Sequence, residues 1–318
     1  MAALFRTSIL RTSLLLVAAL LPVGVKAQLA AAYILTDHTS GYTLEAYKAE
    51  QKRPIASLTK IATAKVVLDW AASTGTDLSQ LISIPPQAIR PYSTNPIGLQ
   101  PDDQMSYRDL IYSAMMESDG TAAQALAYTV GASLRARAAG SLGELGAVEA
   151  FVTQMNALAR QLGMEKTLFV NPDGLEPEKG PQPYSTAADV VKLVAYAMND
   201  AGFRFYVSQP ERKVTFIRGG QTLGYLLRNT NELLGSNGVD GVKTGTTARA
   251  GQCIALSSQK DPEIRKDGET TYVTPRRVDV VILGAADRFS VAQQLLSRGW
   301  SLYEQWAAAG RPTQTSKH

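Results

Sequence analysis

The sequence predicts an α+β protein in which both ends of the chain contribute to one antiparallel sheet and a helical region is inserted between them. Strand-like patterns occur over residues 31–47 and again in the last third of the chain. Apolar residues with a period near 3.6 dominate the middle of the chain. With 318 residues, 45% of them hydrophobic, the chain is long enough for one large domain or two small ones.

The N-terminal segment has the features of a secretory signal peptide. Arg6 and Arg11 form a charged region, a short apolar run follows, and small residues occupy Val25 and Ala27 before the expected cleavage point. We therefore predict a signal peptide over residues 1–27, a folded domain over 28–310 and a disordered tail over 311–318. An uncleaved N-terminal anchor is the alternative interpretation of this segment.

The charge balance gives no sign of a nucleic-acid or anionic-lipid partner. Residues 1–27 contain three basic residues and no acidic one, so 29 basic and 28 acidic residues remain after cleavage. A net charge near zero provides no electrostatic footprint for a polyanion. We expect neither nucleic-acid binding nor a strong membrane anchor.

Cysteine and histidine are too scarce for several kinds of site. Cys253 is the single cysteine, which excludes an intramolecular disulfide and a cysteine-based metal cluster. It lies in an apolar, strand-like run, where a buried inert thiol is expected. His38 and His318 are the two histidines, one in a turn and one at the last position. A Ser-His-Asp triad and a histidine-rich zinc site are therefore not expected, and the sequence implies no metal or cofactor.

The first half of the chain reads as a hairpin followed by helices. Turn residues 37–41 separate the two strands of the hairpin. A helix with Pro54 just ahead of it is expected to run to about Ala72, because its apolar residues repeat with helical spacing. The later expected segments are a helix from 106 to about 116, a helix from 121 to about 130, a surface insertion over 131–147 and an amphipathic helix over 149–162.

The second half reads as one helix, then strands, then a closing helix. Ser185 is expected to be the N-cap of a helix that runs to Met198. Strands are expected at 213–217, 223–228, 241–247, 252–257 and 278–284. The closing helix, 291–308, carries an apolar stripe that indicates core packing.

Ser57 and Lys60 are the strongest candidate catalytic pair. They lie three residues apart, which places both side chains on one face of a helix. A serine hydroxyl becomes a good nucleophile only when a nearby base takes its proton. With histidine so scarce, a lysine whose pKa is lowered by burial or by a second cation is the available base.

Two further motifs follow in the order that this chemistry requires. Ser118-Asp119-Gly120 lies at a corner between two helices, and Lys243-Thr244-Gly245 lies in a strand flanked by glycines. Each motif alone is weak, since Ser118 could cap a helix and Lys243 could be an exposed strand residue. The three motifs together, in this order, are typical of serine β-lactamases and penicillin-binding proteins.

The chain resembles the low-molecular-mass penicillin-binding proteins, the serine D-alanyl-D-alanine carboxypeptidases of bacteria. The resemblance covers nearly all of residues 31–307 and implies a β-lactamase/transpeptidase-like fold. It rests on the motifs Ala56-Ser57-Leu58-Thr59-Lys60, Asn171-Pro172-Asp173-Gly174-Leu175, Ser185-Thr186-Ala187-Ala188-Asp189, Asn229-Thr230-Asn231 and Gly241-Val242-Lys243-Thr244-Gly245-Thr246-Thr247.

The resemblance implies catalytic roles for Ser57, Lys60 and Ser118, and it places Lys243 among the substrate-binding residues next to them. Ser57 would attack the carbonyl between two D-alanines of a peptidoglycan stem peptide and form an acyl-enzyme. Lys60 would take the serine proton, and Ser118 would pass it to the leaving amine. Lys243 would add positive charge that lowers the pKa of Lys60. β-Lactam antibiotics would acylate the same serine.

The resemblance also implies how the substrate is held. Thr244, Thr246 and Arg288 would bind its terminal carboxylate. Backbone amides of Ser57 and Thr246 would form an oxyanion hole. Gly245 would let a peptide backbone approach the strand closely.

Gly120 departs from the family pattern, in which an asparagine usually occupies this position and contacts the substrate amide and the active-site lysine. Asp119 would compensate only if its side chain turns inward. The chain also stops after one closing helix, as in the short endopeptidase relatives, whereas many carboxypeptidases of the family carry a second β-rich domain.

Four functions therefore stay open. The main prediction is a D,D-carboxypeptidase that removes the terminal D-alanine, in a periplasmic or cell-wall location. A D,D-endopeptidase that cleaves cross-links is the nearest alternative. A class A-like β-lactamase would use a glutamate such as Glu176 to activate water. A non-catalytic cell-wall binding protein is supported by Gly120 alone. The sequence makes no prediction of oligomeric state.

Overall fold

The computed structural model describes residues 29–137 and 141–313, so the predicted signal peptide lies outside the described residues. Its centre is a five-stranded antiparallel sheet with the strand order β2-β1-β9-β8-β7. The strands are β1 (Ala30–Asp37), β2 (Thr43–Tyr47), β7 (Val239–Thr247), β8 (Gly251–Asp267) and β9 (Thr270–Ala285). The N-terminal hairpin thus pairs with the C-terminal strands, which confirms the predicted α+β arrangement.

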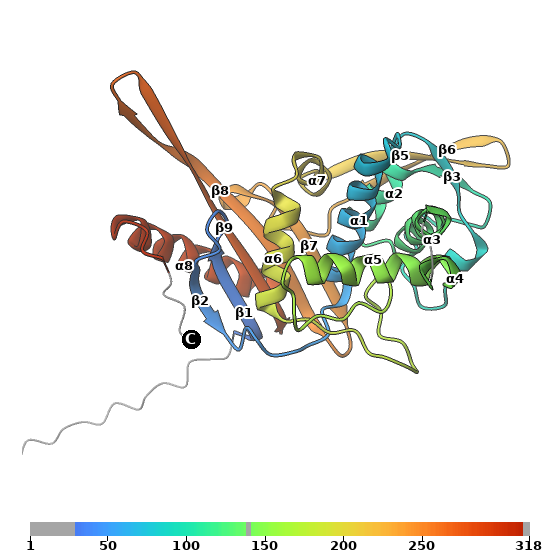
Figure 1. Cartoon of the computed structure of the whole chain (residues 1–318), viewed down its shortest axis with the longest axis horizontal. Helices are drawn as coiled ribbons and strands as arrows, with labels where there is room; N and C mark the ends of the chain where they lie inside the picture. The colour runs from blue at the N-terminus through green and yellow to red at the C-terminus, as the bar shows by residue number, and fades with distance from the viewer. Residues whose placement is uncertain (1–28, 138–140, 314–318) are drawn as a thin grey trace, which may run out of the picture.

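The two faces of this sheet are covered by different helices (Figure 1). Successive side chains of a strand point to opposite faces. Val280 and Ile282 of β9 accordingly belong to the cluster around helix α8 (Arg288–Ala308), whereas Val281 and Leu283 belong to the larger cluster around the other helices. The expected closing helix is therefore a core element, as its apolar stripe predicted.

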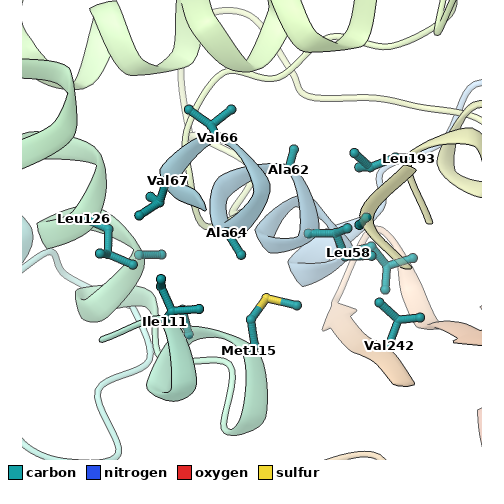
Figure 2. Packing of buried hydrophobic residues seen from close by; sticks show 14 of the residues in the cluster. Leu58, Ala62, Ala64, Val66, Val67, Ile111, Met115, Leu126, Leu193 and Val242 are labelled. Carbon is teal, nitrogen blue, oxygen red and sulfur yellow. The ribbon is translucent and has the colours of Figure 1, made fainter. Parts of the chain in front are cut away.

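The helical region packs around one central helix. Figure 2 shows α1 surrounded by side chains of α2, α3, α6 and strand β7, among them Ile111, Leu126, Leu193 and Val242. The helices of this region are α1 (Thr59–Thr74), α2 (Tyr107–Met116), α3 (Gly120–Arg137), α4 (Ser141–Glu144), α5 (Ala147–Gln161), α6 (Ala187–Met198) and α7 (Ala201–Val207). Because α1 is surrounded in this way, the residues at its start are fixed by the core of the protein.

A second sheet, which was not predicted from the sequence as a unit, lies on the side of the helical region away from the first sheet (Figure 1). It has four antiparallel strands in the order β3-β4-β5-β6. Its strands are β3 (Leu81–Ser83), β4 (Gln104–Ser106), β5 (Glu211–Arg218) and β6 (Gln221–Arg228). Strands β3 and β4 are three residues long, too short to leave a clear alternating pattern in the sequence. Short 3-10 turns complete the fold: η1 (Ala56–Leu58), η2 (Pro86–Ala88) and η3 (Ser236–Gly238).

Four local expectations need correction. The N-cap of α6 is Thr186, whose hydroxyl accepts from the amide of Asp189 at 3.0 Å, and not Ser185. Helix α3 continues through the first part of the expected insertion, to Arg137. Strands β8 and β9 extend into a long projecting hairpin (Figure 1). Of the tail expected to be disordered over 311–318, residues 311–313 are placed and Arg311 binds Glu263 at 2.7 Å, whereas 314–318 lie outside the described residues.

Within the described ranges, no helix has both the length and the apolarity that a membrane crossing requires.

Candidate active site

Ser57 lies in the tight turn η1 that leads into α1. The preceding residue, Ala56, adopts a left-handed backbone conformation with φ of 49°, which a residue with a side chain rarely adopts. Gly174 packs directly against this turn, since a Cβ added at Gly174 would lie 2.0 Å from the carbonyl oxygen of Ala56. The nucleophile candidate is therefore presented by a strained turn that its neighbours hold in place.

Lys60 makes the contact that the Ser-x-x-Lys spacing predicts. Its Nζ lies 3.1 Å from Ser57 Oγ and donates to the carbonyl oxygen of Asp173 at 2.9 Å. The side chain is almost completely buried, and this burial lowers the pKa of Lys60 to about 8 against the opposing effect of the Asp173 and Asp119 carboxylates. A substantial fraction of neutral amine near physiological pH makes Lys60 a competent base.

The turn at residues 171–175 carries that carbonyl group and is held by its own hydrogen bonds. The side chain of Asn171 accepts from the amide of Gly174 at 2.8 Å and donates to the carbonyl of Leu175 at 2.6 Å. Thr63, on α1, donates to the carbonyl of Pro172 at 2.7 Å. The turn is thereby fixed to α1, and its Asp173 carbonyl orients the amine of Lys60. This role of the motif was not predicted from the sequence.

Ser118 lies at the corner between α2 and α3, in a left-handed conformation with φ of 62°. Its backbone carbonyl accepts from the hydroxyl of Thr94 at 2.6 Å. Ser118 lines the same cleft as Ser57, and its Oγ has no hydrogen-bond partner within the described part of the chain. The hydroxyl is therefore available for a substrate group.

The side chain of Asp119 turns inward, which is the condition stated above for it to compensate for the side chain missing at Gly120. The residue is fully buried, and its Oδ1 accepts from the amide of Ala122 at 2.9 Å, while its Oδ2 has no partner among the described atoms. Burial raises the pKa of Asp119 to about 7, and the charge of Lys60 opposes this shift. Asp119 is thus an electrostatic partner of Lys60 and not a contact of its amine.

Strand β7 brings the third motif to the cleft. Lys243 is buried, and its Nζ donates to the carbonyl of Thr244 at 3.0 Å. Burial, followed by repulsion from Lys60 and Arg288, lowers the pKa of Lys243 well below its ordinary value. We expected Lys243 to lower the pKa of Lys60, but burial is the cause of that shift. The repulsion between the two amines instead contributes to the lowered pKa of Lys243.

Two hydroxyls and one guanidinium complete the β7 side of the cleft. Thr244 Oγ1 is 2.7 Å from the hydroxyl of Thr230, which belongs to the Asn-Thr-Asn motif. Arg288, at the start of α8, hydrogen-bonds the hydroxyl of Thr246 and donates to the carbonyl of Gly245 at 2.9 Å. These contacts form a surface of donors suited to a carboxylate.

The three motifs therefore line or underlie one cleft of about 580 Å³. Its lining includes Ser57, Ser118, Thr244, Gly245, Thr246 and Arg288, with Lys60 and Lys243 buried behind it. Thr94 and Thr230 also line the cleft and were not among the predicted site residues. No cluster of metal-ligating side chains is present in the described ranges.

Two curated proteins are similar to this chain in sequence. The chain is 32% identical over 225 residues to a D-alanyl-D-alanine endopeptidase of Pseudomonas aeruginosa, covering 70% of this chain and 65% of the relative. It is 31% identical over 288 residues to the D-alanyl-D-alanine carboxypeptidase DacC of Escherichia coli, covering 86% of this chain and 62% of the relative. The chain thus spans less than two thirds of the length of these two relatives.

Solved structures share the fold. The Streptomyces K15 DD-transpeptidase superposes with a TM-score of 0.71 at 26% identity, covering 86% of this chain and 97% of that one. Penicillin-binding protein D2 of Listeria monocytogenes, in its ampicillin-bound form, gives 0.66 at 26% identity and covers 85% and 97% of the two chains. The sequence profile of the D-alanyl-D-alanine carboxypeptidases matches residues 22–265. The chain belongs to the D-alanyl-D-alanine carboxypeptidase family.

Proposed function

We propose that this protein is a serine D,D-carboxypeptidase that removes the terminal D-alanine from peptidoglycan stem peptides. The observation that carries the proposal is the buried amine of Lys60, with a pKa of about 8, lying 3.1 Å from the hydroxyl of Ser57. This is the arrangement of an activated serine nucleophile. Membership of the D-alanyl-D-alanine carboxypeptidase family supports the choice of substrate.

The proposed reaction uses these side chains in a fixed order. Neutral Lys60 takes the proton of Ser57 Oγ, and the oxygen attacks the carbonyl carbon between the two D-alanines. Backbone amides of Ser57 and Thr246 bind the oxyanion that forms. When the peptide C–N bond breaks, Ser118 passes a proton from Lys60 to the departing amine. Water then hydrolyses the ester on Ser57 and restores the free hydroxyl.

The terminal carboxylate of the substrate would bind on the β7 side of the cleft. Arg288 and the hydroxyls of Thr244 and Thr246 supply the donors there. Arg288 lies half-buried with its guanidinium already oriented by Gln252 and by two backbone carbonyls. A pre-positioned guanidinium favours substrates that end in a free carboxylate.

D,D-endopeptidase activity on cross-links is the second candidate, favoured by the similarity to the P. aeruginosa endopeptidase. The discriminating experiment offers the purified chain and its Ser57→Ala variant free pentapeptide and cross-linked dimer, with products identified by mass. Release of D-alanine from pentapeptide alone supports the carboxypeptidase, and conversion of dimer to monomer supports the endopeptidase. No product from either peptide would contradict both.

A penicillin time course tests the two remaining alternatives. We expect a long-lived covalent adduct on the wild type and none on Ser57→Ala, as for a penicillin-binding protein. Rapid loss of the adduct with hydrolysed drug would indicate a β-lactamase. Glu176, the glutamate considered for that role, accepts from the hydroxyl of Thr247 at 2.6 Å and is not among the cleft-lining residues. Absence of any adduct would favour a binding protein.

The place of action follows from the same proposal. Peptidoglycan lies outside the inner membrane, so we propose that residues 1–27 direct secretion and that the enzyme works in the periplasm or at the cell wall. Fractionation of cells that express the full chain, with N-terminal sequencing of the product, tests this. Recovery of uncleaved protein from the cytoplasm would contradict it.

A further inference from the structure

The space beside Gly120 is filled by another segment of the chain. A Cβ added at Gly120 would lie 2.1 Å from Ser93 Oγ and 3.3 Å from both the backbone nitrogen and the hydroxyl of Thr94. Ser93 Oγ is itself buried and lacks a hydrogen-bond partner among the described atoms. The position of this hydroxyl is thus set by packing, and any side chain at 120 would displace it.

Thr94 is bound tightly to the corner that carries Ser118. Its Oγ1 donates to the carbonyl of Ser118 at 2.6 Å and accepts from the amide of Gly120 at 2.9 Å. Its backbone carbonyl accepts from the amides of Gly120 and Thr121 at 2.8 and 3.1 Å. Four hydrogen bonds therefore connect one threonine to the first turn of α3 and to the residue that bears the proposed proton relay.

Thr94 also faces the substrate cleft. It is exposed, and it lines the same cleft as Ser57 and Ser118. No hydrogen bond is recorded for its backbone N–H within the described ranges. A peptide that enters the cleft would meet Thr94 on the Ser118 side, opposite the β7 strand.

We propose that Thr94 is a substrate-contacting residue of this enzyme and that Gly120 is required because it seats the Ser93–Thr94 segment in the cleft. The proposal rests on the proposed function, since the substrate it concerns is the same peptide. Thr94 is a small polar group that contacts the peptide backbone next to the scissile bond. Gly120 is then a packing requirement of this site, and its missing side chain is not a defect.

The seating is tested by Gly120→Ala alone and combined with Ser93→Ala. In the single variant the new methyl group displaces Ser93 Oγ and presses on the backbone nitrogen and hydroxyl of Thr94, each 3.3 Å away, so kcat/KM for D-alanine release is expected to fall about tenfold. Removing Oγ in the double variant should restore the value to within about threefold, because the remaining contacts near 3.3 Å need only small adjustments. Gly224→Ala, in exposed strand β6 against a flexible lysine, is the matched control.

The contact is tested by Thr94→Val and Thr94→Ser. Valine keeps the shape but removes the hydroxyl that donates to the Ser118 carbonyl and accepts from the Gly120 amide. We expect kcat/KM to fall about fivefold to tenfold, because the Thr94 backbone N–H is then no longer held against the Ser118 corner. Thr94→Ser keeps the hydroxyl and should have a kcat/KM close to that of the wild type. Thr271→Val, in the exposed part of β9, is the control. Melting temperatures and separate kcat and KM values distinguish a substrate contact from general loosening.

The outcomes separate this inference from the function on which it rests. Wild-type release of D-alanine with unchanged kinetics in Gly120→Ala and Thr94→Val would overturn the inference and leave the function intact. A fall in Gly120→Ala that Ser93→Ala fails to rescue would overturn the seating. A wild type that neither turns over peptide nor reacts with penicillin would remove the proposed function, and the Thr94 contact would fall with it.

Discussion

Gly245 of β7 lies against Ser57 at the start of α1, so closely that a Cβ at 245 would come within 2.9 Å of the backbone nitrogen of Ser57. The same Cβ would lie 3.2 Å from the side chain of Ala56 and from the carbonyl of Ile55. Strand β7 and the turn that carries Ser57 can therefore pack this closely only because residue 245 has no side chain. Three motifs that are far apart in sequence depend on this approach to form one site.

Gly245→Ala is expected to reduce acylation of Ser57 by a penicillin about tenfold or more, since the loss of one oxyanion-hole donor alone costs about 100-fold or more. The added methyl group must push β7 away from the turn that carries Ser57. Rates of adduct formation, measured by intact mass, provide the test. The control variant Gly224→Ala should be acylated at the wild-type rate. A wild-type rate for Gly245→Ala would contradict the prediction, because it would mean that the close packing of Gly245 against Ser57 is not needed for acylation.

Acylation of the wild type is expected to rise with pH and to level off near pH 8. Lys60 accepts a proton only as the neutral amine, and burial lowers its pKa to about 8. Below that value the neutral fraction falls about tenfold for each pH unit. Second-order rate constants for acylation between pH 5.5 and 10 give the profile. A flat profile from pH 6 to 8 would contradict the assignment of Lys60 as the base.

Asp119→Asn is expected to move the rising part of this profile toward lower pH, by about half a unit to one unit. The ionised carboxylate of Asp119 favours the ammonium form of Lys60, so its removal lowers the pKa of Lys60 further. The same acylation series on the variant is the measurement. An unchanged profile would mean that the two groups are not coupled in solution.

The same variant is expected to change how stability depends on pH. The pKa of Asp119 is raised by burial to about 7, above its ordinary value of 3.8. Between these values the unfolded chain releases a proton that the folded protein keeps, so the contribution of Asp119 to stability decreases as pH rises from about 4 to about 7. Asp119→Asn has no such titrating group. Its melting temperature should therefore fall less than that of the wild type when the pH is raised from 4 to 8. Parallel melting curves across this range would contradict the raised pKa.

Arg288→Leu is expected to lower kcat/KM for peptides with a free terminal carboxylate by about tenfold or more, since a hydrogen bond to a charged group contributes about 1.5–3 kcal/mol. Amidated peptides, which lack the charge, should be affected much less. Comparing both substrates on wild type and variant isolates the carboxylate contact. Arg298→Leu, on the exposed side of α8 beside Glu45, is the control. An equal loss on both substrates would indicate a structural role for Arg288.

Local spacing in the sequence determines much of the site. Ser57 and Lys60 share one helical repeat, so their proximity follows from the geometry of a helix. The scarcity of histidine left lysine as the base. The strand-like patterns at both chain ends predicted the antiparallel sheet, because successive side chains of a strand point to opposite faces and leave a period of two in the sequence.

Tertiary structure decided what local spacing cannot express. Burial of Lys60, and not its neighbour Lys243, sets its pKa, and burial is a property of the surrounding core. Whether Asp119 turns inward depends on the packing of α3. Thr94 joins the cleft from a breaker-rich loop 24 residues before Ser118, through hydrogen bonds to a glycine whose missing side chain makes the room. Such contacts between distant segments leave no periodic trace in the chain, since each depends on how whole elements pack and not on the residues beside it.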